Sequence, residues 1–274
     1  MNKTKLHSDI AWSTPAAIGV HGYDLCNELM GEINFGDMAF LEVTARLPNA
    51  NESRLFNAIL ITLVEHGIVP STMAARLTYA GAPEAMQGAV AAGLLGLGSV
   101  FVGSTEGAAR MLSDAIPMNL PKSDTPSKAA MQDMAQAIVK DHRAQKKIIA
   151  GLGHPIHKPI DPRTPRLFAI AQQTGFHGRY VELMQIVADT AGAAFGKVLP
   201  INATGAIGAL CCEMGLEWKV SRGLGVMARA VGLVGHILEE SKQPMSMELW
   251  HRTEEEASDH MRGQFRNTKD KTRD

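Results

Sequence analysis

Apolar residues recur at helical spacing along most of the chain. Leu55, Ile59 and Leu63 are four residues apart, as on one face of an α-helix, and Asn51 is expected to cap this helix. Proline and glycine mark the helices that follow, because proline fits the first turn and glycine readily ends a helix. We predict further helices over residues 70–81, 85–97, 106–116, 126–147, 165–174, 179–195, 206–214 and 224–241. The pattern predicts an all-α fold.

Strand-like alternation is limited to short stretches, such as residues 40–44. Any sheet should therefore be no more than a short hairpin. A different signal appears between residues 85 and 98, where alanine, glycine and leucine predominate. Small side chains let two helices approach closely, because the distance between helix axes depends on the side chains at the contact. We expect this helix to be buried against another helix, at a dimer interface.

The composition supports a helical globular protein and excludes several functional classes. Of 274 residues, 45% are hydrophobic but only 5% are aromatic, whereas strands favour aromatic and β-branched residues. The net charge of −1 gives no basis for binding nucleic acid or an anionic membrane. The first residues lack a signal-peptide core, and the most apolar stretch, residues 89–102, is too short to span a bilayer. Three cysteines fit no disulfide framework, so we expect a cytoplasmic protein.

A proline-rich loop between residues 151 and 163 contains the most concentrated polar chemistry. Three prolines and two glycines exclude a regular helix there. The loop nevertheless carries five polar side chains, those of His154, His157, Lys158, Asp161 and Arg163. A rigid loop with these groups is a better functional candidate than a charged helix face. No metal is expected, because a proline separates the two histidines and no third ligand is clear.

His66 and the arginines have ordinary structural explanations when each is taken alone. His66 follows Leu63 by three residues, so it could be a core histidine that bonds to a carbonyl group. Arg163 and Arg229 could each form a surface ion pair. A functional assignment therefore requires a pattern that connects these residues.

Five segments, in order along the chain, supply that pattern. They are residues 20–25 (VHGYDL), 65–67 (EHG), 151–154 (GLGH), 161–163 (DPR) and 228–236 (ARAVGLVGH). With these segments the sequence resembles the citrate synthase superfamily, most of all its short citryl-CoA lyase branch, which is also the C-terminal module of ATP-citrate lyase. The resemblance extends over roughly residues 10–250, and the ordered set is more specific than any one segment.

The resemblance implies an all-α fold with a large helical domain, an inserted small helical domain and an active site in the cleft between them. The large domain would comprise residues 1–104 and 205–274. The small domain would comprise residues 105–204 and carry the loop that binds coenzyme A. A homodimer or a larger homo-oligomer is also implied.

The resemblance further implies an acyl-CoA and a small di- or tricarboxylate as substrates. His154 would polarise the hydroxyl or keto oxygen at the cleaved carbon, and His66 would contact other substrate oxygens. Arg163 and Arg229 would bind the carboxylates through charge-assisted, often bidentate bonds.

Coenzyme A would bind to the loop that begins at Gly151 and Gly153. The loop backbone would receive the adenine, and Lys158 lies where the resemblance places a basic residue on a phosphate. Coenzyme A would be present as part of the substrate or product, without a metal.

One position departs from the pattern. Related sequences have an aspartate in an N-[VI]-D-G segment, but residues 202–205 read NATG, with Thr204 at that position. A threonine cannot be a carboxylate base at neutral pH. Glu65 and Glu106 are candidates to supply another acid or base. A histidine segment of true synthases also has no counterpart here, which favours a lyase.

The predicted activity is retro-Claisen cleavage of citryl-CoA, or of a related hydroxyacyl-CoA, to acetyl-CoA and a 2-oxo acid such as oxaloacetate. A base would take the proton of the tertiary hydroxyl, and the main catalytic demand would be stabilisation of the acetyl-CoA enolate. Two alternatives stay open: a condensing acyltransferase like citrate synthase, and a catalytically weak homologue that binds coenzyme A.

Overall fold

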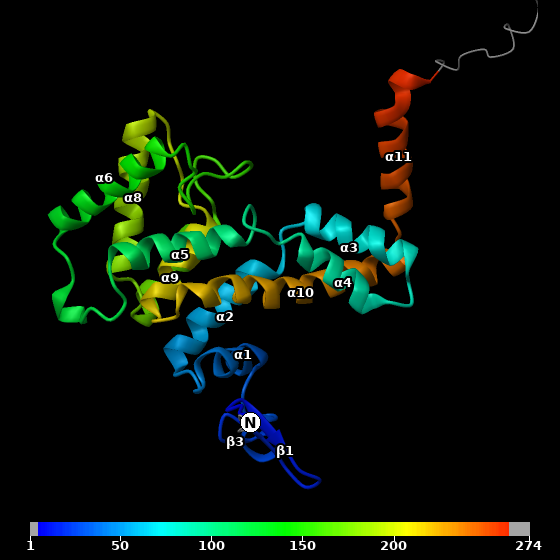
Figure 1. The fold of residues 1–274 in the computed structure, drawn as a ribbon, viewed down its shortest axis with the longest axis horizontal. Helices are drawn as coiled ribbons and strands as arrows, with labels where there is room; N and C mark the ends of the chain where they lie inside the picture. Colours follow the sequence, from blue (N-terminus) through cyan, green and yellow to red (C-terminus); the bar gives the residue numbers. More distant parts are fainter. Residues whose placement is uncertain (1–4, 263–274) are drawn as a thin grey trace, which may run out of the picture. The chain divides into compact units, whose positions relative to one another are not determined.

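The computed structural model describes residues 5–262, and helices make up most of this part of the chain (Figure 1). The all-α prediction is therefore confirmed. Three short pieces are a π-helix at Leu25–Leu29 and 3₁₀ turns at Lys122–Asp124 and Asp259–Met261. The α-helices are α1 (Phe35–Thr44), α2 (Ala50–Val64), α3 (Pro70–Gly81), α4 (Met86–Leu95), α5 (Gly103–Ala115), α6 (Lys128–Ala144), α7 (Arg163–Thr174), α8 (Arg179–Phe195), α9 (Ala203–Glu213), α10 (Trp218–Lys242) and α11 (Ser246–Ser258).

A small antiparallel sheet precedes the helices. Its strands are β1 (Ala11–Ser13), β2 (Ile18–Val20) and β3 (Tyr23–Asp24), in that spatial order. The predicted strand-like stretch at residues 40–44 is instead the second half of α1. Phe40 and Leu41 are adjacent and both fully buried, which a strand with one solvent face does not permit.

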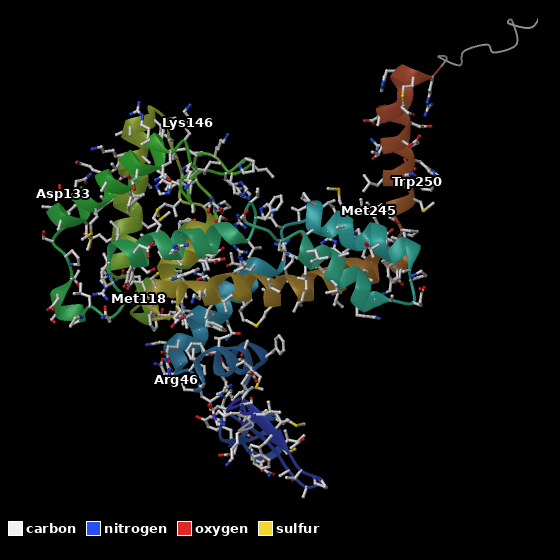
Figure 2. All side chains as sticks on the ribbon, in the orientation of Figure 1. Arg46, Met118, Asp133, Lys146, Met245 and Trp250 are labelled. Atoms are coloured by element: carbon white, nitrogen blue, oxygen red, sulfur yellow. The ribbon has the colours of Figure 1, made fainter. Side chains whose placement is uncertain are left out.

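The first helices show how short polar residues set the helix starts. The cap of α2 is Asn49 rather than Asn51, because the Asn49 side chain accepts the backbone N–H of Glu52 while the Glu52 carboxylate accepts that of Asn49. Such a capping box satisfies two N–H groups that a helix start leaves unpaired. Arg46 then forms an ion pair with Glu52 at 2.6 Å, which fixes the connection between α1 and α2 (Arg46 is labelled in Figure 2).

The chain forms two compact units. The first contains Met1–Glu65 and Leu97–Arg229, and the second contains His66–Gly96 and Ala230–Asp274. The chain passes from one unit to the other after Glu65, after Gly96 and, inside α10, after Arg229. The boundaries of these units differ from those of the predicted large and small domains. The division into a large and a small domain stays a prediction.

Close helix contacts build the core of the first unit. Helices α5 and α9 run side by side, and α8 packs against both α6 and α9 (Figure 1). A side chain at Gly208 would place its Cβ 2.8 Å from the backbone nitrogen of Ala109 on α5. Glycine and alanine therefore let the two helices approach, and this contact fixes where the N-termini of α5 and α9 lie.

The second unit contains α3, α4 and α11, with the end of α10. Its buried apolar residues are Ala75, Ala89, Leu233 and Ile237. The prediction that the helix after residue 85 is buried is correct for one face only. Ala89 is buried, whereas Leu95 on the same helix is 87% exposed. None of the helices within residues 5–262 combines the length and apolar character needed to cross a membrane.

A buried ion pair holds the second unit together. The Arg76 guanidinium on α3 donates to Glu240 on α10 at 2.8 Å, and both side chains are only 2% exposed. The other oxygen of Glu240 accepts the backbone N–H groups of Met245 and Ser246, where α11 begins (Met245 is labelled in Figure 2). One carboxylate thus connects three helices.

Replacement of Arg76 should therefore destabilise the protein strongly. We expect Arg76→Met to lower the free energy of unfolding by about 3–5 kcal/mol, because it leaves the Glu240 charge buried without its cation. The matched control is Arg110→Met, whose ion pair with Asp114 is exposed and should contribute less than about 1 kcal/mol. Urea unfolding of both variants measures the difference. Equal losses would contradict a stabilising role for the buried pair.

Candidate active site

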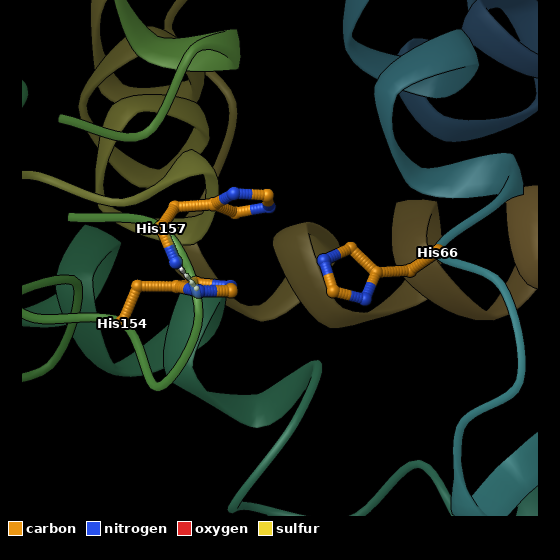
Figure 3. Close-up of side chains that lie close together, drawn as sticks. All are labelled: His66, His154 and His157. Atoms are coloured by element: carbon orange, nitrogen blue, oxygen red, sulfur yellow. Dashed lines mark hydrogen bonds between the residues drawn. The ribbon is translucent and has the colours of Figure 1, made fainter.

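His154 lies in the loop before α7, and its ring is held by the backbone of the same loop. Its Nδ1 atom accepts the N–H group of Ile156 at 3.1 Å. It also accepts the N–H group of His157 at 2.9 Å (Figure 3). An atom that accepts two N–H donors carries no proton, so the neutral ring has its proton on Nε2. The His157 ring stacks on it, with the centroids 4.4 Å apart. The loop therefore presents His154 as a donor rather than as a base.

Gly151 and Gly153 bring this loop against the start of α9. Both have positive φ, +85° and +78°, a region that glycine adopts without steric cost. Asn202 N–H donates to Gly151 O at 3.0 Å, and Gly153 N–H donates to Pro200 O at 2.7 Å. A Cβ on Gly151 would lie 2.4 Å from the Cα of Gly205. The loop and the helix start thus form one closely packed unit.

Asp161 is the buried centre of the loop. Its side chain is fully buried, and it accepts two hydrogen bonds from the Arg163 guanidinium, at 2.9 and 2.8 Å. It also accepts the backbone N–H of Arg163 at 3.1 Å and that of Ala203, the first residue of α9, at 2.9 Å. Burial alone would raise the pKa of Asp161, but these donors outweigh it and hold the pKa at about 2.

Arg229 supplies a second guanidinium near Arg163. It is 8% exposed, and its Nε donates to the backbone oxygen of Leu63 at 3.2 Å. Burial lowers the pKa of Arg229, the Glu65 carboxylate raises it, and the charge of Arg163 lowers it. The structure therefore places the two predicted arginines within each other's electrostatic influence. Glu65 is a nearby counter-charge of Arg229, which makes it a weaker candidate for a free base.

Thr204 is the second residue of α9 and belongs to a chain of hydrogen bonds. Its hydroxyl donates to Asn202 Oδ1 at 2.6 Å, and the Ser104 hydroxyl approaches Thr204 Oγ1 at 2.9 Å. Asn202 Oδ1 also accepts the N–H of Gly205 at 3.0 Å, and Asn202 Nδ2 donates to Gly153 O at 2.6 Å. Thr204 is thus held in place, between the loop and α5.

Glu106, the other candidate for a substitute acid, has a different partner. It lies two residues after Ser104 on α5, which places it on another side of that helix. Its carboxylate forms an ion pair with Arg222 on α10. The charge of Glu106 is therefore compensated by a guanidinium, and Ser104 is the α5 residue that meets Thr204.

Two further predicted residues are Lys158 and His66. Lys158 is exposed near the end of the loop, available to solvent. His66 begins the second compact unit, two residues after the end of α2. Burial raises the pKa of the Cys211 thiol to about 11, so Cys211 is not a nucleophile at neutral pH. The first unit alone therefore brings together His154, Arg163, Thr204, Gly151 and Gly153, with Arg229 close to Arg163.

This arrangement suits an anionic substrate with a polar oxygen. Two guanidinium groups can bind carboxylates, and a ring N–H fixed by the backbone can polarise a hydroxyl or carbonyl oxygen. The hydroxyl of Thr204 adds a neutral group beside them. Sequence reasoning missed Ser104, which lies in no motif and is 100 residues from Thr204.

Comparison with known proteins gives a consistent picture. The family described as citrate synthase, C-terminal domain, matches residues 27–250. A solved citryl-CoA lyase from Hydrogenobacter thermophilus is 34% identical, with a TM-score of 0.74 over 86% of each chain. An ATP citrate lyase from Methanothrix soehngenii, in complex with citrate and coenzyme A, is 22% identical with a TM-score of 0.70. That similarity covers 88% of this chain and 40% of the other, and it concerns the fold.

Curated relatives are longer proteins. A probable ATP-citrate synthase from Dictyostelium discoideum is 24% identical over 84% of this chain. The chain spans only 37% of that relative's length.

The low pKa of Asp161 leads to a pH-dependent prediction. A carboxyl whose pKa is lower in the folded state stabilises the fold above its unfolded pKa, and this stabilisation is lost as pH falls through the folded pKa. From the values of 3.8 and about 2, Asp161→Asn should cost about 2 kcal/mol at pH 7. The difference from the unsubstituted protein should shrink between about pH 4 and pH 2.

Urea unfolding at several pH values tests this expectation. The control is Asp114→Asn, because Asp114 is 69% exposed and its ion pair should contribute little at any pH. A cost of Asp161→Asn that stays constant down to pH 2 would show that the carboxyl does not titrate as described.

Proposed function

Because the chain belongs to the citrate synthase family, we propose that it is a carbon–carbon lyase. It cleaves citryl-CoA, or a related hydroxyacyl-CoA, by a retro-Claisen reaction to acetyl-CoA and a 2-oxo acid such as oxaloacetate. The observation that carries the proposal is the 34% identity with a citryl-CoA lyase over 86% of both chains. Thr204 supports the lyase direction, because a threonine cannot remove the weakly acidic methyl proton that condensation requires.

The two arginines account for recognition of the carboxylates. Arg163 uses Nε and one terminal nitrogen on Asp161, which orients the planar guanidinium and leaves other N–H groups for a substrate. Arg229 carries a second positive charge in the same region. Their mutual repulsion in the free protein is relieved when a dianionic substrate binds, which favours a dicarboxylate over a monocarboxylate.

His154 and Thr204 have distinct roles in the proposed reaction. The Nε2–H of His154 donates to the oxygen at the carbon where the bond breaks, and it stabilises the carbonyl that forms there. Thr204 places an uncharged hydroxyl next to the acetyl group. For His66, which lies in the second compact unit, contact with substrate oxygens stays a prediction from the sequence.

The proposed coenzyme A site is the loop of residues 151–163. The packing of Gly151 and Gly153 against the start of α9 holds the loop in one conformation, which reduces the entropy lost on binding. Lys158 supplies an exposed cation for a phosphate. In the predicted division into a large and a small domain, this loop belongs to the small domain.

We also propose a cytoplasmic homodimer. Among the described residues Cys26, Cys211 and Cys212 are all unpaired, as is usual in a reducing compartment. The open face of α4, where Leu95 is exposed, offers apolar surface to a second copy.

Incubation with citryl-CoA and a panel of hydroxyacyl-CoAs tests the activity directly. We expect acetyl-CoA and oxaloacetate to be released from citryl-CoA. Mass spectrometry detects both products. Arg163→Met should lower kcat/KM by roughly 100-fold, as for a lost charged hydrogen bond, whereas the surface variant Arg110→Met should not. Faster condensation of acetyl-CoA with oxaloacetate would identify a synthase. Binding of coenzyme A without either reaction would identify a non-catalytic homologue.

The loop assignment predicts a specific loss of affinity. Lys158→Ala should weaken binding of coenzyme A by about 1–2 kcal/mol, because it removes one charged hydrogen bond. Isothermal calorimetry measures the affinity, with Lys128→Ala as a control, since Lys128 is an exposed lysine at the start of α6. Unchanged affinity for Lys158→Ala would place the coenzyme elsewhere.

A further inference from the structure

We propose that Ser104 is a positioning residue: together with Asn202 it fixes the orientation of the Thr204 hydroxyl, so that the remaining lone pair of Thr204 holds a water molecule in the site. This inference rests on the proposed lyase function and assigns the source of the proton that the reaction needs. It starts from the 2.9 Å contact between the two hydroxyl oxygens, which joins the second residue of α5 to the second residue of α9.

The orientation of Asn202 determines where the Thr204 proton lies. Asn202 Nδ2 donates to the Gly153 carbonyl, and Oδ1 accepts the Gly205 N–H, so a flipped amide would lose both bonds. Thr204 Oγ1 is 2.6 Å from Asn202 Oδ1. Two oxygens are this close only when a proton lies between them, and the amide oxygen has none to give. The Thr204 hydroxyl therefore donates to Asn202.

The Ser104 hydroxyl has one proton and two acceptors. Phe101 O lies at 2.6 Å and Thr204 Oγ1 at 2.9 Å. The proton is shared between them, and the contact with Ser104 occupies one side of the Thr204 oxygen. One lone pair of Thr204 is left, so Thr204 acts toward the site as an acceptor and not as a donor.

The position of Ser104 is fixed by the surroundings of α5. The ion pair between Glu106 and Arg222 ties the first turn of α5 to α10. A Cβ on Gly225 of α10 would lie 2.2 Å from Val102 Cγ1, so α10 approaches the start of α5 closely. Ser104 and Thr204 are both half-buried, which gives a water molecule access to the pair.

Because the Thr204 hydroxyl only accepts, a water molecule can donate one of the water's O–H groups to it. The second O–H then points toward the acetyl carbon. As the carbon–carbon bond breaks, its electron pair forms the enolate, and a C–H bond forms while a water O–H bond breaks. That hydroxide takes the proton directly from the tertiary hydroxyl as its O–H bond breaks, so water is restored and no other base has to hold the proton. Solvent replaces a carboxylic acid as the proton donor.

Steady-state cleavage of citryl-CoA by Ser104 variants tests this role. Ser104→Ala should lower kcat roughly 3- to 10-fold with little change in KM, as for one lost hydrogen bond. Ser104→Thr keeps the hydroxyl and should retain the activity. The matched control is Ser113→Ala, because Ser113 lies on the same helix and bonds in the same way to the carbonyl three residues before it, that of Arg110. That variant should be unaffected.

The same substitution in a Thr204→Val variant shows whether Ser104 acts through Thr204 or only through the stability of the fold. When Thr204 is replaced by valine, Ser104→Ala should cause no further loss, because the two residues act through one hydroxyl pair. Additive losses would overturn the inference, as would equal kcat values for Ser104→Ala and Ser113→Ala, or loss of folding in Ser104→Ala. No cleavage by the folded unsubstituted protein would instead overturn the proposed function itself.

Discussion

The buried carboxylate of Asp161 is the interaction on which the site depends. An ionised carboxylate inside a protein is tolerated only when donors surround it, and its donors come from Arg163 and from the first residue of α9. The loop, the start of α7 and the start of α9 therefore form together. If one of these segments is displaced, the Asp161 carboxylate loses part of the hydrogen bonding that compensates its charge. The same hydrogen bonds that stabilise the fold therefore also fix the position of Arg163.

Helical spacing alone predicted most of the fold, because the apolar faces of α2 and its neighbours repeat at the helical period. It failed where two signals overlap. The stretch at residues 40–44 alternates like a strand, yet Phe40 and Leu41 are both buried between α1 and its neighbours. The start of α2 was misplaced by two residues because Asn49 and Asn51 are equally good caps, and only the partner Glu52 distinguishes them.

The site divides into a part that motifs predict and a part that they do not. Short motifs pointed to His154 and Arg163, because both lie in one loop of the sequence. The proximity of Arg163 and Arg229, and the contact between Ser104 and Thr204, depend on how α5, α7, α9 and α10 pack. No local signal encodes such contacts. Spacing likewise gives no proton positions, so the donor role of His154 follows only from the backbone N–H groups that its Nδ1 accepts.

The contact between Gly151 and Gly205 limits how this site can be redesigned. No side chain fits between them, and hydrogen bonds join residues 151–153 to residues 200–202 on both sides of the contact. A loop transplanted from a relative would meet a helix start shaped for another backbone. In the proposed lyase, a change of substrate range would therefore require residues 151–163 and 200–205 to be exchanged together, as one block.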